Sequence, residues 1–335
     1  MTRNPVRLAV SMGDPAGVGP EVILGAVTGL SREIEVTIFG DRRVIGAAAE
    51  AMSSAGRKGP VPDREVDLIP VSVLADSEIC FGKPSGIAGE ASYRYVIAAL
   101  RAVMAGDADA LVTAPISKQW WMEAGHNYPG HTELLAEQTG TKNYAMMLAG
   151  PSLRVVPVTT HIPLDRVSKS LSTEKVLGTI RLVNKTLIEW FDIKKPRLAC
   201  TALNPHAGEG GYLGKEEIEI ILPAVESAKG EGTQVTGPIP ADSLFARRDD
   251  YDAVICMYHD QALIPIKTLH LLDAVNLTLG LPIVRTSPDH GTAYDIAGKG
   301  VAKPDSMLAA MEMAAMIAEK ILDKKTGKKT TRGNN

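Results

Sequence analysis

The chain has 335 residues, 45% hydrophobic and 22% charged, a balance typical of a globular protein. Its net charge of −3 and aromatic content of 4% argue against a nucleic-acid-binding protein, which needs basic surface or stacking platforms. The sequence has no apolar run of about 18 residues for a membrane span, and the run before Asp14 is too short for a signal peptide. Because Cys80, Cys200 and Cys256 are odd in number and widely spaced, we expect reduced thiols and a cytoplasmic enzyme.

Strand-like and helix-like segments alternate, which predicts an α/β fold with a largely parallel sheet. Short apolar runs predict strands at 8–12, 35–39, 110–113, 155–160, 198–203 and 254–257. Helical periodicity and helix-start signals predict helices at 20–30, 90–105, 173–191, 215–229 and 304–324. The stretch 146–160 is apolar without an intervening helix, so we expect antiparallel strands there.

The first predicted strand runs into a glycine-rich segment, G-D-P-A-G-V-G-P, at 13–20. It is neither GxGxxG nor GxxxxGKS/T, and its two prolines remove amide donors that a phosphate cradle needs. We therefore expect a shaped turn near a ligand crevice. Phosphate binding at the start of the following helix is the alternative.

The segment Y-P-G-H-T-E-L-L predicts a helix whose N-cap is His131 or Thr132, with Glu133 in the first turn. A capped surface helix is one interpretation. The other places His131 and the Thr132 hydroxyl at a helix start that faces a polar or anionic substrate.

Three histidines each follow a predicted strand: His161 in T-T-H-I-P, His206 in N-P-H-A-G-E and His259 in Y-H-D-Q. Because the carboxyl ends of parallel strands line one crevice, we expect these imidazoles to face the same ligand space. With Asp242 and Asp260 nearby, they suit a divalent-metal site with open positions. The spacings of 45 and 53 residues match no local metal motif, so three structural histidines are the alternative.

Three further polar residues lie nine positions apart: Lys267, Asn276 and Arg285. Lys267 is about two helical turns beyond His259 on a predicted short helix, and Arg285 ends an apolar strand. Two cations with an amide between them suit a phosphate or carboxylate ligand. One structural salt bridge and one solvated lysine are the alternative.

Seven segments carry a resemblance to a known family: G-D-P-A-G-V-G-P, G-H-T-E, T-T-H-I-P, L-N-P-H-A-G-E, G-P-I-P-A-D-S-L-F, Y-H-D-Q-A-L-I-P-I-K and V-N-L-T-L-G-L-P-I-V-R-T-S-P-D-H-G-T-A. In this order they resemble the 4-hydroxythreonine-4-phosphate dehydrogenase family over residues 8–310. The resemblance implies an isocitrate/isopropylmalate dehydrogenase-like α/β fold, not a Rossmann fold. Two interleaved lobes around a mostly parallel mixed sheet, with a cleft between them, would form a single catalytic unit at 1–325, and 326–335 a tail.

The resemblance also implies one divalent metal per subunit (Zn, Mg, Mn or Co), held by His161, His206 and His259, with ligands shared across a homodimer interface. It implies that a phosphorylated hydroxy acid is bound by His131, Thr132, Lys267, Asn276 and Arg285. Lys267 is our first candidate to take the hydroxyl proton, with Asp242 or a metal-bound water as alternatives.

A second segment, H-G-T-A-Y-D-I-A-G-K-G-V-A-K-P at 290–304, is similar to the adenosine-binding loop of the isopropylmalate and isocitrate dehydrogenases. The similarity implies cofactor contacts from His290, Ala293 and Asp295. An acidic residue at 295 suits the ribose hydroxyls of NAD and repels the 2′-phosphate of NADP, so NAD is expected and NADP is the alternative. Tyr294 replaces the proline usual in the isopropylmalate enzymes.

The implied reaction is NAD-dependent oxidation of 4-phosphohydroxy-L-threonine at C3 to 2-amino-3-oxo-4-phosphooxybutanoate. That product decarboxylates to 3-amino-2-oxopropyl phosphate, in pyridoxal phosphate biosynthesis. A sister dehydrogenase acting on 4-phospho-D-threonate or 4-phospho-D-erythronate is the nearest alternative. A metal-dependent phosphatase would use the same histidines but would have no use for an adenosine loop.

Overall fold

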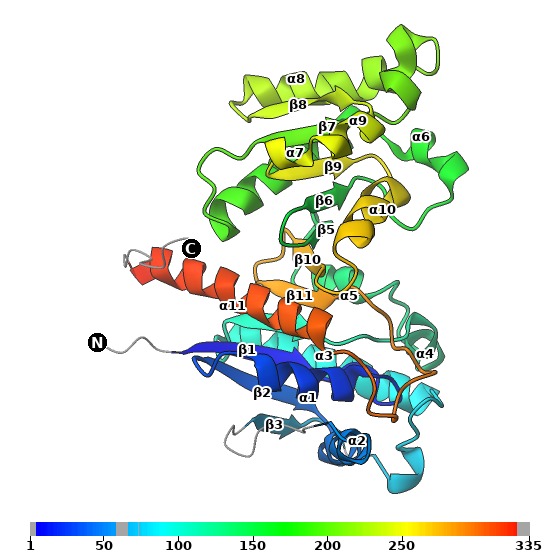
Figure 1. Ribbon diagram of the computed structural model, residues 1–335, viewed down its shortest axis with the longest axis vertical. Helices are drawn as coiled ribbons and strands as arrows, with labels where there is room; N and C mark the ends of the chain where they lie inside the picture. The colour runs from blue at the N-terminus through cyan, green and yellow to red at the C-terminus, as the bar shows by residue number, and fades with distance from the viewer. Residues whose placement is uncertain (1–4, 58–65, 73, 327–335) are drawn as a thin grey trace. The chain divides into compact units, whose positions relative to one another are not determined.

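A computed structural model describes residues 5–57, 66–72 and 74–326 of the chain. The chain divides into two compact units: unit 1 is Met1–Thr141 with Leu281–Asn335, and unit 2 is Lys142–Gly280. Unit 2 is therefore inserted between two segments of unit 1 (Figure 1). Of the tail expected at 326–335, Thr326 ends a helix, and the other residues lie outside the described part.

Unit 1 contains a parallel sheet with the order β3-β2-β1-β4-β11. Its strands are β1 (Val6–Ser11), β2 (Ile34–Gly40), β3 (Asp67–Pro70), β4 (Ala110–Thr113) and β11 (Arg285–Pro288). Every residue of β4 and β11 is buried, as expected for parallel strands covered on both faces. Because the strands are parallel, the loops after β1, β4 and β11 leave the same edge of the sheet.

The helical segments of unit 1 are α1 (Gly19–Gly29), α2 (Arg42–Ser54), η1 (Asp76–Glu78), α3 (Gly86–Ala105), α4 (Lys118–Glu123), α5 (His131–Gln138) and α11 (Asp305–Thr326). Helix α3 begins where the Ser85 side chain accepts the amide of Ala88, and it ends at Gly106, whose φ is +83°. It packs against β1, β2 and β4, whereas α11 packs against β1, β4 and β11. On its α3 face the sheet contributes Ala9, Phe39 and Leu111 to an apolar core.

Unit 2 has a mixed sheet with the order β10-β5-β6-β9-β7-β8. Its strands are β5 (Ala145–Ala149), β6 (Arg154–Pro157), β7 (Leu198–Thr201), β8 (Val235–Ile239), β9 (Ala253–Cys256) and β10 (Val275–Leu279). The pairs β10–β5 and β5–β6 are antiparallel, which confirms the prediction for 146–160. The pairs β6–β9, β9–β7 and β7–β8 are parallel.

The helical segments of unit 2 are η2 (Leu164–Arg166), α6 (Val167–Ser170), α7 (Thr173–Trp190), η3 (Pro205–Gly211), η4 (Glu217–Ile221), α8 (Leu222–Gly230), α9 (Ala241–Ala246), η5 (Arg248–Asp250) and α10 (His259–Leu269). The long predicted helix is α7, and Ser172 caps it by accepting the amide of Lys175. The helix expected at 215–229 is instead a π-helical turn, η4, that continues into α8.

Two local predictions are wrong. The N-cap of α5 is Gly130, so His131 and Thr132 are the first two residues inside the helix. Arg285 begins β11 rather than ending the apolar run before it, because that run belongs to the turn after β10. Within the described residues, none of the helices is long and apolar enough to cross a membrane.

Candidate active site

Two of the three predicted metal histidines lie close together in unit 2. Strands β6 and β9 are adjacent and parallel, and His161 and His259 follow their carboxyl ends. The Thr159 hydroxyl donates to the carbonyl oxygen of Met257 at 2.7 Å, so the pairing of the two chain segments continues past the strands. As a result, the two imidazole rings lie 5.5 Å apart, centroid to centroid.

A neighbouring carboxylate orients the His259 ring. His259 is the first residue of α10, and its Nδ1 lies 2.6 Å from Oδ1 of Asp260. When Nδ1 carries the proton in this contact, Nε2 keeps its lone pair and is available to a metal. This carboxylate–imidazole arrangement is the one that usually supports metal-bound histidines.

His206 lies on a loop with an unusual backbone. In η3, residues 206–210 all have positive φ, and the φ of His206 is +51°. His161 also has a positive φ, of +46°. Side chains other than glycine disfavour this region by about 1–2 kcal/mol, and such residues cluster at functional sites. Two of the three predicted metal ligands therefore have strained backbones.

No three His, Cys, Asp or Glu side chains form a ready metal cluster within the described part of the chain. The structure thus joins His161 with His259 but does not add His206 or Asp242 to them as a third ligand. Two neutral imidazoles fit two positions of a zinc, cobalt or manganese centre, because these ions accept nitrogen ligands.

Sequence reasoning missed Gln261, which joins the ends of β7 and β9. Its Oε1 accepts the Thr201 hydroxyl and the Met257 amide, both at 2.7 Å, and its Nε2 donates to the carbonyl oxygen of Ala202 at 2.7 Å. The side chain is 8% exposed, so these bonds form away from water. The only signal in the sequence was its place in the Y-H-D-Q segment, two residues after His259.

In unit 1, the glycine-rich segment packs against the expected cofactor loop. The amide of Val18 donates to the carbonyl oxygen of Thr292 at 2.9 Å. A Cβ at Gly17 would lie 2.9 Å from that same oxygen, so only glycine allows this approach. The segment is therefore a shaped turn that supports the 290–304 loop.

Two buried carboxylates hold this loop. Asp14, fully buried, accepts the Tyr294 hydroxyl at 2.6 Å and the Ala16 amide at 2.9 Å. Burial raises the pKa of Asp14, while these two hydrogen bonds oppose the rise. Glu21, in the first turn of α1, accepts the Gly298 amide. Tyr294, the departure from the isopropylmalate pattern, thus fastens the loop to the glycine-rich turn.

The three predicted cofactor residues follow β11 within this loop. Ala293 has a φ of +43°, a strained value for alanine. His290 and Asp295 are exposed, which leaves their side chains accessible to a ligand.

His131, at the start of α5, is partly buried. Its ring meets the edge of Trp121 with centroids 5.5 Å apart, and its Nε2 is buried without a hydrogen-bond partner. Burial lowers the pKa of His131 well below its ordinary value, and the positive charges of Arg285 and Lys118 lower it further. The ring is therefore neutral and has an unused polar atom.

Arg285 is a buried cation beside β4. It is 2% exposed, and its Nε and Nη2 donate to the Thr113 hydroxyl at 3.1 and 2.6 Å. Burial lowers the pKa of Arg285 to about 9, although the charge of Glu133 opposes this. A buried guanidinium is costly unless it is paired with an anion, and its planar fork suits phosphate or carboxylate.

Asn276 and Lys267 are carried by unit 2. Asn276 lies on β10, and its Oδ1 is buried without a hydrogen-bond partner. Lys267 lies in the last turn of α10, half-buried and two turns from His259. Since native proteins satisfy nearly all buried polar atoms, the unused Oδ1 of Asn276 suits a ligand contact, as does the unused Nε2 of His131 in unit 1.

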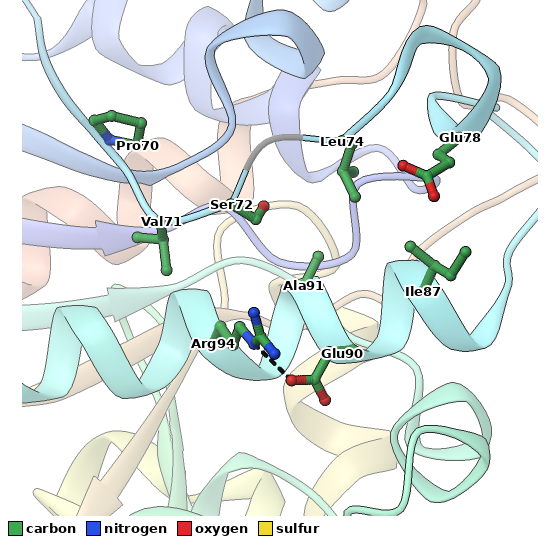
Figure 2. A pocket seen from close by; sticks show the side chains of 9 residues that line it. All are labelled: Pro70, Val71, Ser72, Leu74, Glu78, Ile87, Glu90, Ala91 and Arg94. Carbon is green, nitrogen blue, oxygen red and sulfur yellow. Dashed lines mark hydrogen bonds and ion pairs between the residues drawn. The ribbon is translucent and has the colours of Figure 1, made fainter.

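A separate hollow of about 550 Å³ lies on unit 1 between α3 and the segment after β3 (Figure 2). No predicted site residue lines it. Its polar side chains already have partners: Glu90 contacts Arg94 and His126, and Ser72 contacts Tyr95. Because these side chains are already engaged with one another, we assign the hollow no role.

A family model described as pyridoxal phosphate biosynthetic protein PdxA matches residues 32–314. The chain belongs to the PdxA family. It is 45% identical to the 4-hydroxythreonine-4-phosphate dehydrogenase of Trichlorobacter lovleyi, over 93% of this chain and 97% of that one.

Two other comparisons bear on the site and the fold of this PdxA-family chain. It is 40% identical to a putative D-threonate 4-phosphate dehydrogenase of Oceanobacillus iheyensis, over 95% of this chain and 99% of that one. A crystal structure of 4-hydroxythreonine-4-phosphate dehydrogenase from Klebsiella pneumoniae matches with a TM-score of 0.81 and 36% identity. That match covers 95% of this chain and 99% of the other.

Proposed function

We propose that this PdxA-family chain is an NAD-dependent, metal-assisted 4-hydroxythreonine-4-phosphate dehydrogenase of pyridoxal phosphate biosynthesis. The substrate would be 4-phosphohydroxy-L-threonine, oxidised at C3 to a β-keto acid that loses carbon dioxide to give 3-amino-2-oxopropyl phosphate. The observation that carries the proposal is the pair of imidazoles, His161 and His259, at the ends of adjacent parallel strands.

The proposed fold is the isocitrate/isopropylmalate dehydrogenase-like arrangement, with units 1 and 2 as its lobes in a single catalytic unit. Support comes from the 290–304 loop, which follows β11 and packs on a glycine-rich turn lacking the Rossmann fingerprint. We also propose a cytoplasmic location, which suits the free cysteines, two of them buried.

The proposed metal ligands are His161 and His259 of one subunit and His206 of the partner subunit in a homodimer. Support comes from the pair itself, which has no third ligand within the described part of its own chain. Large apolar side chains follow each histidine and are 64–88% exposed in the single chain: Leu164, Tyr212, Ile264 and Leu271. Such side chains suit burial against a second copy.

The chain's own groups have distinct proposed roles. When bound, the metal supplies Lewis acidity at the C3 hydroxyl and the nicotinamide supplies a hydride acceptor. Nζ of Lys267 would take the proton of the C3 hydroxyl when that alcohol is oxidised. Arg285, with a buried positive charge, binds the phosphate or carboxylate.

The remaining assignments complete the proposal. His131, Thr132 and Asn276 contact the substrate, and the unused Nε2 of His131 and Oδ1 of Asn276 support this role. His290, Ala293 and Asp295 bind NAD, with the exposed Asp295 carboxylate facing the ribose hydroxyls and disfavouring NADP.

A complementation experiment tests the shared metal site. We expect His206→Ala and His259→Ala each to lose metal and turnover. Co-expressed together, they form heterodimers in which one of the two shared sites keeps all its ligands. Because about half the dimers are mixed, activity should return to about a quarter of the wild-type value.

The experiment distinguishes failure of the metal site from failure of the ligand sharing between subunits. Full turnover by either variant after exhaustive chelation would show that the histidines hold no essential metal. Two inactive variants that fail to complement each other would place all three ligands in one chain.

A second substrate class is favoured by one comparison. The Oceanobacillus iheyensis relative is named for D-threonate 4-phosphate, in which a hydroxyl replaces the amine at C2. The same metal, phosphate and NAD groups would serve 4-phospho-D-threonate or 4-phospho-D-erythronate. Only the C2 contact would differ.

A further inference from the structure

A buried carboxylate supports the loop that carries His206. Glu217, the first residue of η4, is 3% exposed. Its Oε1 accepts the backbone amides of Leu203 and Asn204 at 2.8 and 2.7 Å, and its Oε2 accepts Nδ2 of Asn204 at 3.0 Å. One side chain therefore fixes the two residues that lead from β7 into the His206 loop.

Further contacts hold the His206 loop against Glu217. Nδ2 of Asn204 also donates to Oε2 of Glu216 at 2.8 Å, and Glu216 in turn accepts the Ser168 hydroxyl. At Gly208, φ is +74° and a Cβ would lie 2.7 Å from Oε2 of Glu217. The loop thus contacts Glu217 both before and after His206.

The strained backbone of the loop needs such a support. Six successive residues, 206–211, have positive φ, and the three that are not glycine cost several kcal/mol relative to ordinary conformations. Burying an ionised carboxylate is also costly unless hydrogen bonds compensate it. Here the two features support each other, because the amides that Glu217 needs are those that begin the loop.

We propose that Glu217, acting partly through Asn204, is a positioning residue that holds His206 in the geometry a divalent metal requires. The inference rests on the proposed function, in which His206 is a ligand. Glu217 does not contact the metal in this account. It sets the orientation of a ligand, as outer partners of metal sites do.

The test is Mn²⁺ binding by metal-free full-length protein, measured by calorimetry for Glu217→Gln. This variant keeps the shape but places an amide donor where Asn204 needs an acceptor. We expect Mn²⁺ affinity to fall by about tenfold or more, the usual effect of losing an outer partner. The matched control is Glu219→Gln, an exposed site in the same turn, which should bind Mn²⁺ as the wild type does.

Hydrogen exchange provides a readout that does not require metal. The amides of Leu203 and Asn204 should exchange faster in Glu217→Gln than in the wild type or in Glu219→Gln. A folded Glu217→Gln protein with wild-type Mn²⁺ affinity would overturn the inference alone. Absence of Mn²⁺ binding by the wild type would instead refute the metal site in the proposed function.

Asn204→Ser keeps the test decisive if Glu217→Gln does not fold. The shorter side chain loses the contacts to Glu216 and Glu217, whereas both backbone amides can still reach Glu217. We expect Mn²⁺ affinity to fall by several-fold, less than for Glu217→Gln. Unchanged affinity would contradict a positioning role.

Discussion

His131 combines a stability cost with the substrate contact proposed for it. Its ring is packed against Trp121, its Nε2 has no hydrogen-bond partner, and burial together with Arg285 and Lys118 lowers its pKa. A neutral imidazole adds no second positive charge beside the buried guanidinium of Arg285, for which we propose an anionic ligand. The same burial makes the folded protein resist protonation at this ring.

This resistance predicts a pH dependence of stability. Below the ordinary histidine pKa of about 6.5, the unfolded chain binds a proton at His131 that the folded chain does not bind. The free energy of unfolding therefore falls as the pH falls through about 6.5. It stops falling below the lowered pKa that His131 has in the folded protein. The slope from this one group is at most about 1.4 kcal/mol per pH unit. We expect His131→Asn to flatten the curve of unfolding free energy against pH between pH 7 and 5.

The exposed His290 provides the matched control, and His290→Asn should keep the wild-type slope. Equal slopes for His131→Asn and the wild type, measured by denaturant unfolding, would show that the His131 ring is protonated in the folded state.

At the scale of elements, Gln261 determines how the strand ends of unit 2 meet α10. Helix α10 contains Pro265, which removes one backbone donor, so its position depends on contacts outside the helix. Gln261 supplies three of them, to Thr201, Ala202 and Met257. It thereby connects the helix that carries His259 to the strand that precedes His206.

Replacing Gln261 by Met keeps the volume but removes these hydrogen bonds. The Met257 amide and the Ala202 carbonyl then lose their bonds to Gln261, and the Thr201 hydroxyl keeps only a long bond to the carbonyl oxygen of Ile255 at 3.4 Å. We expect the free energy of unfolding to fall by about 3 kcal/mol. Gln119 is exposed on α4, and Gln119→Met should change stability by less than about 0.5 kcal/mol. If urea unfolding gives the same midpoint for the two variants, the Gln261 hydrogen bonds contribute no net stability.

For the whole molecule, local patterns in the sequence predicted the elements well and their long-range support poorly. The apolar run at 110–113 is strand β4, and the Ser172 signal caps α7 as predicted. Both depend on residues within one turn. The loop that carries His206 begins at amides that donate to Glu217, and in the 290–304 loop Tyr294 donates to Asp14, 280 residues away. No local propensity encodes such contacts.

In the candidate site, too, the sequence predicted the features that follow from local patterns better than those that depend on distant residues. The order of parallel strands brings His161 and His259 together, and alternating strands and helices allowed that to be predicted. The prediction that Arg285 ends a strand was wrong, because an apolar run does not reveal where a buried strand begins. The proposed contribution of His206 comes from a partner subunit, and no pattern within one chain predicts a contact between two copies.

The most direct test of the account is NADH formation by purified protein with Mn²⁺. Three substrates are compared: 4-phosphohydroxy-L-threonine, 4-phospho-D-threonate and 4-phospho-D-erythronate. The account predicts metal-dependent turnover of the first substrate with NAD, and little turnover of the other two. Turnover confined to the two sugar-acid phosphates would contradict the assignment to pyridoxal phosphate biosynthesis, and no NAD reduction with any of the three would contradict the dehydrogenase itself.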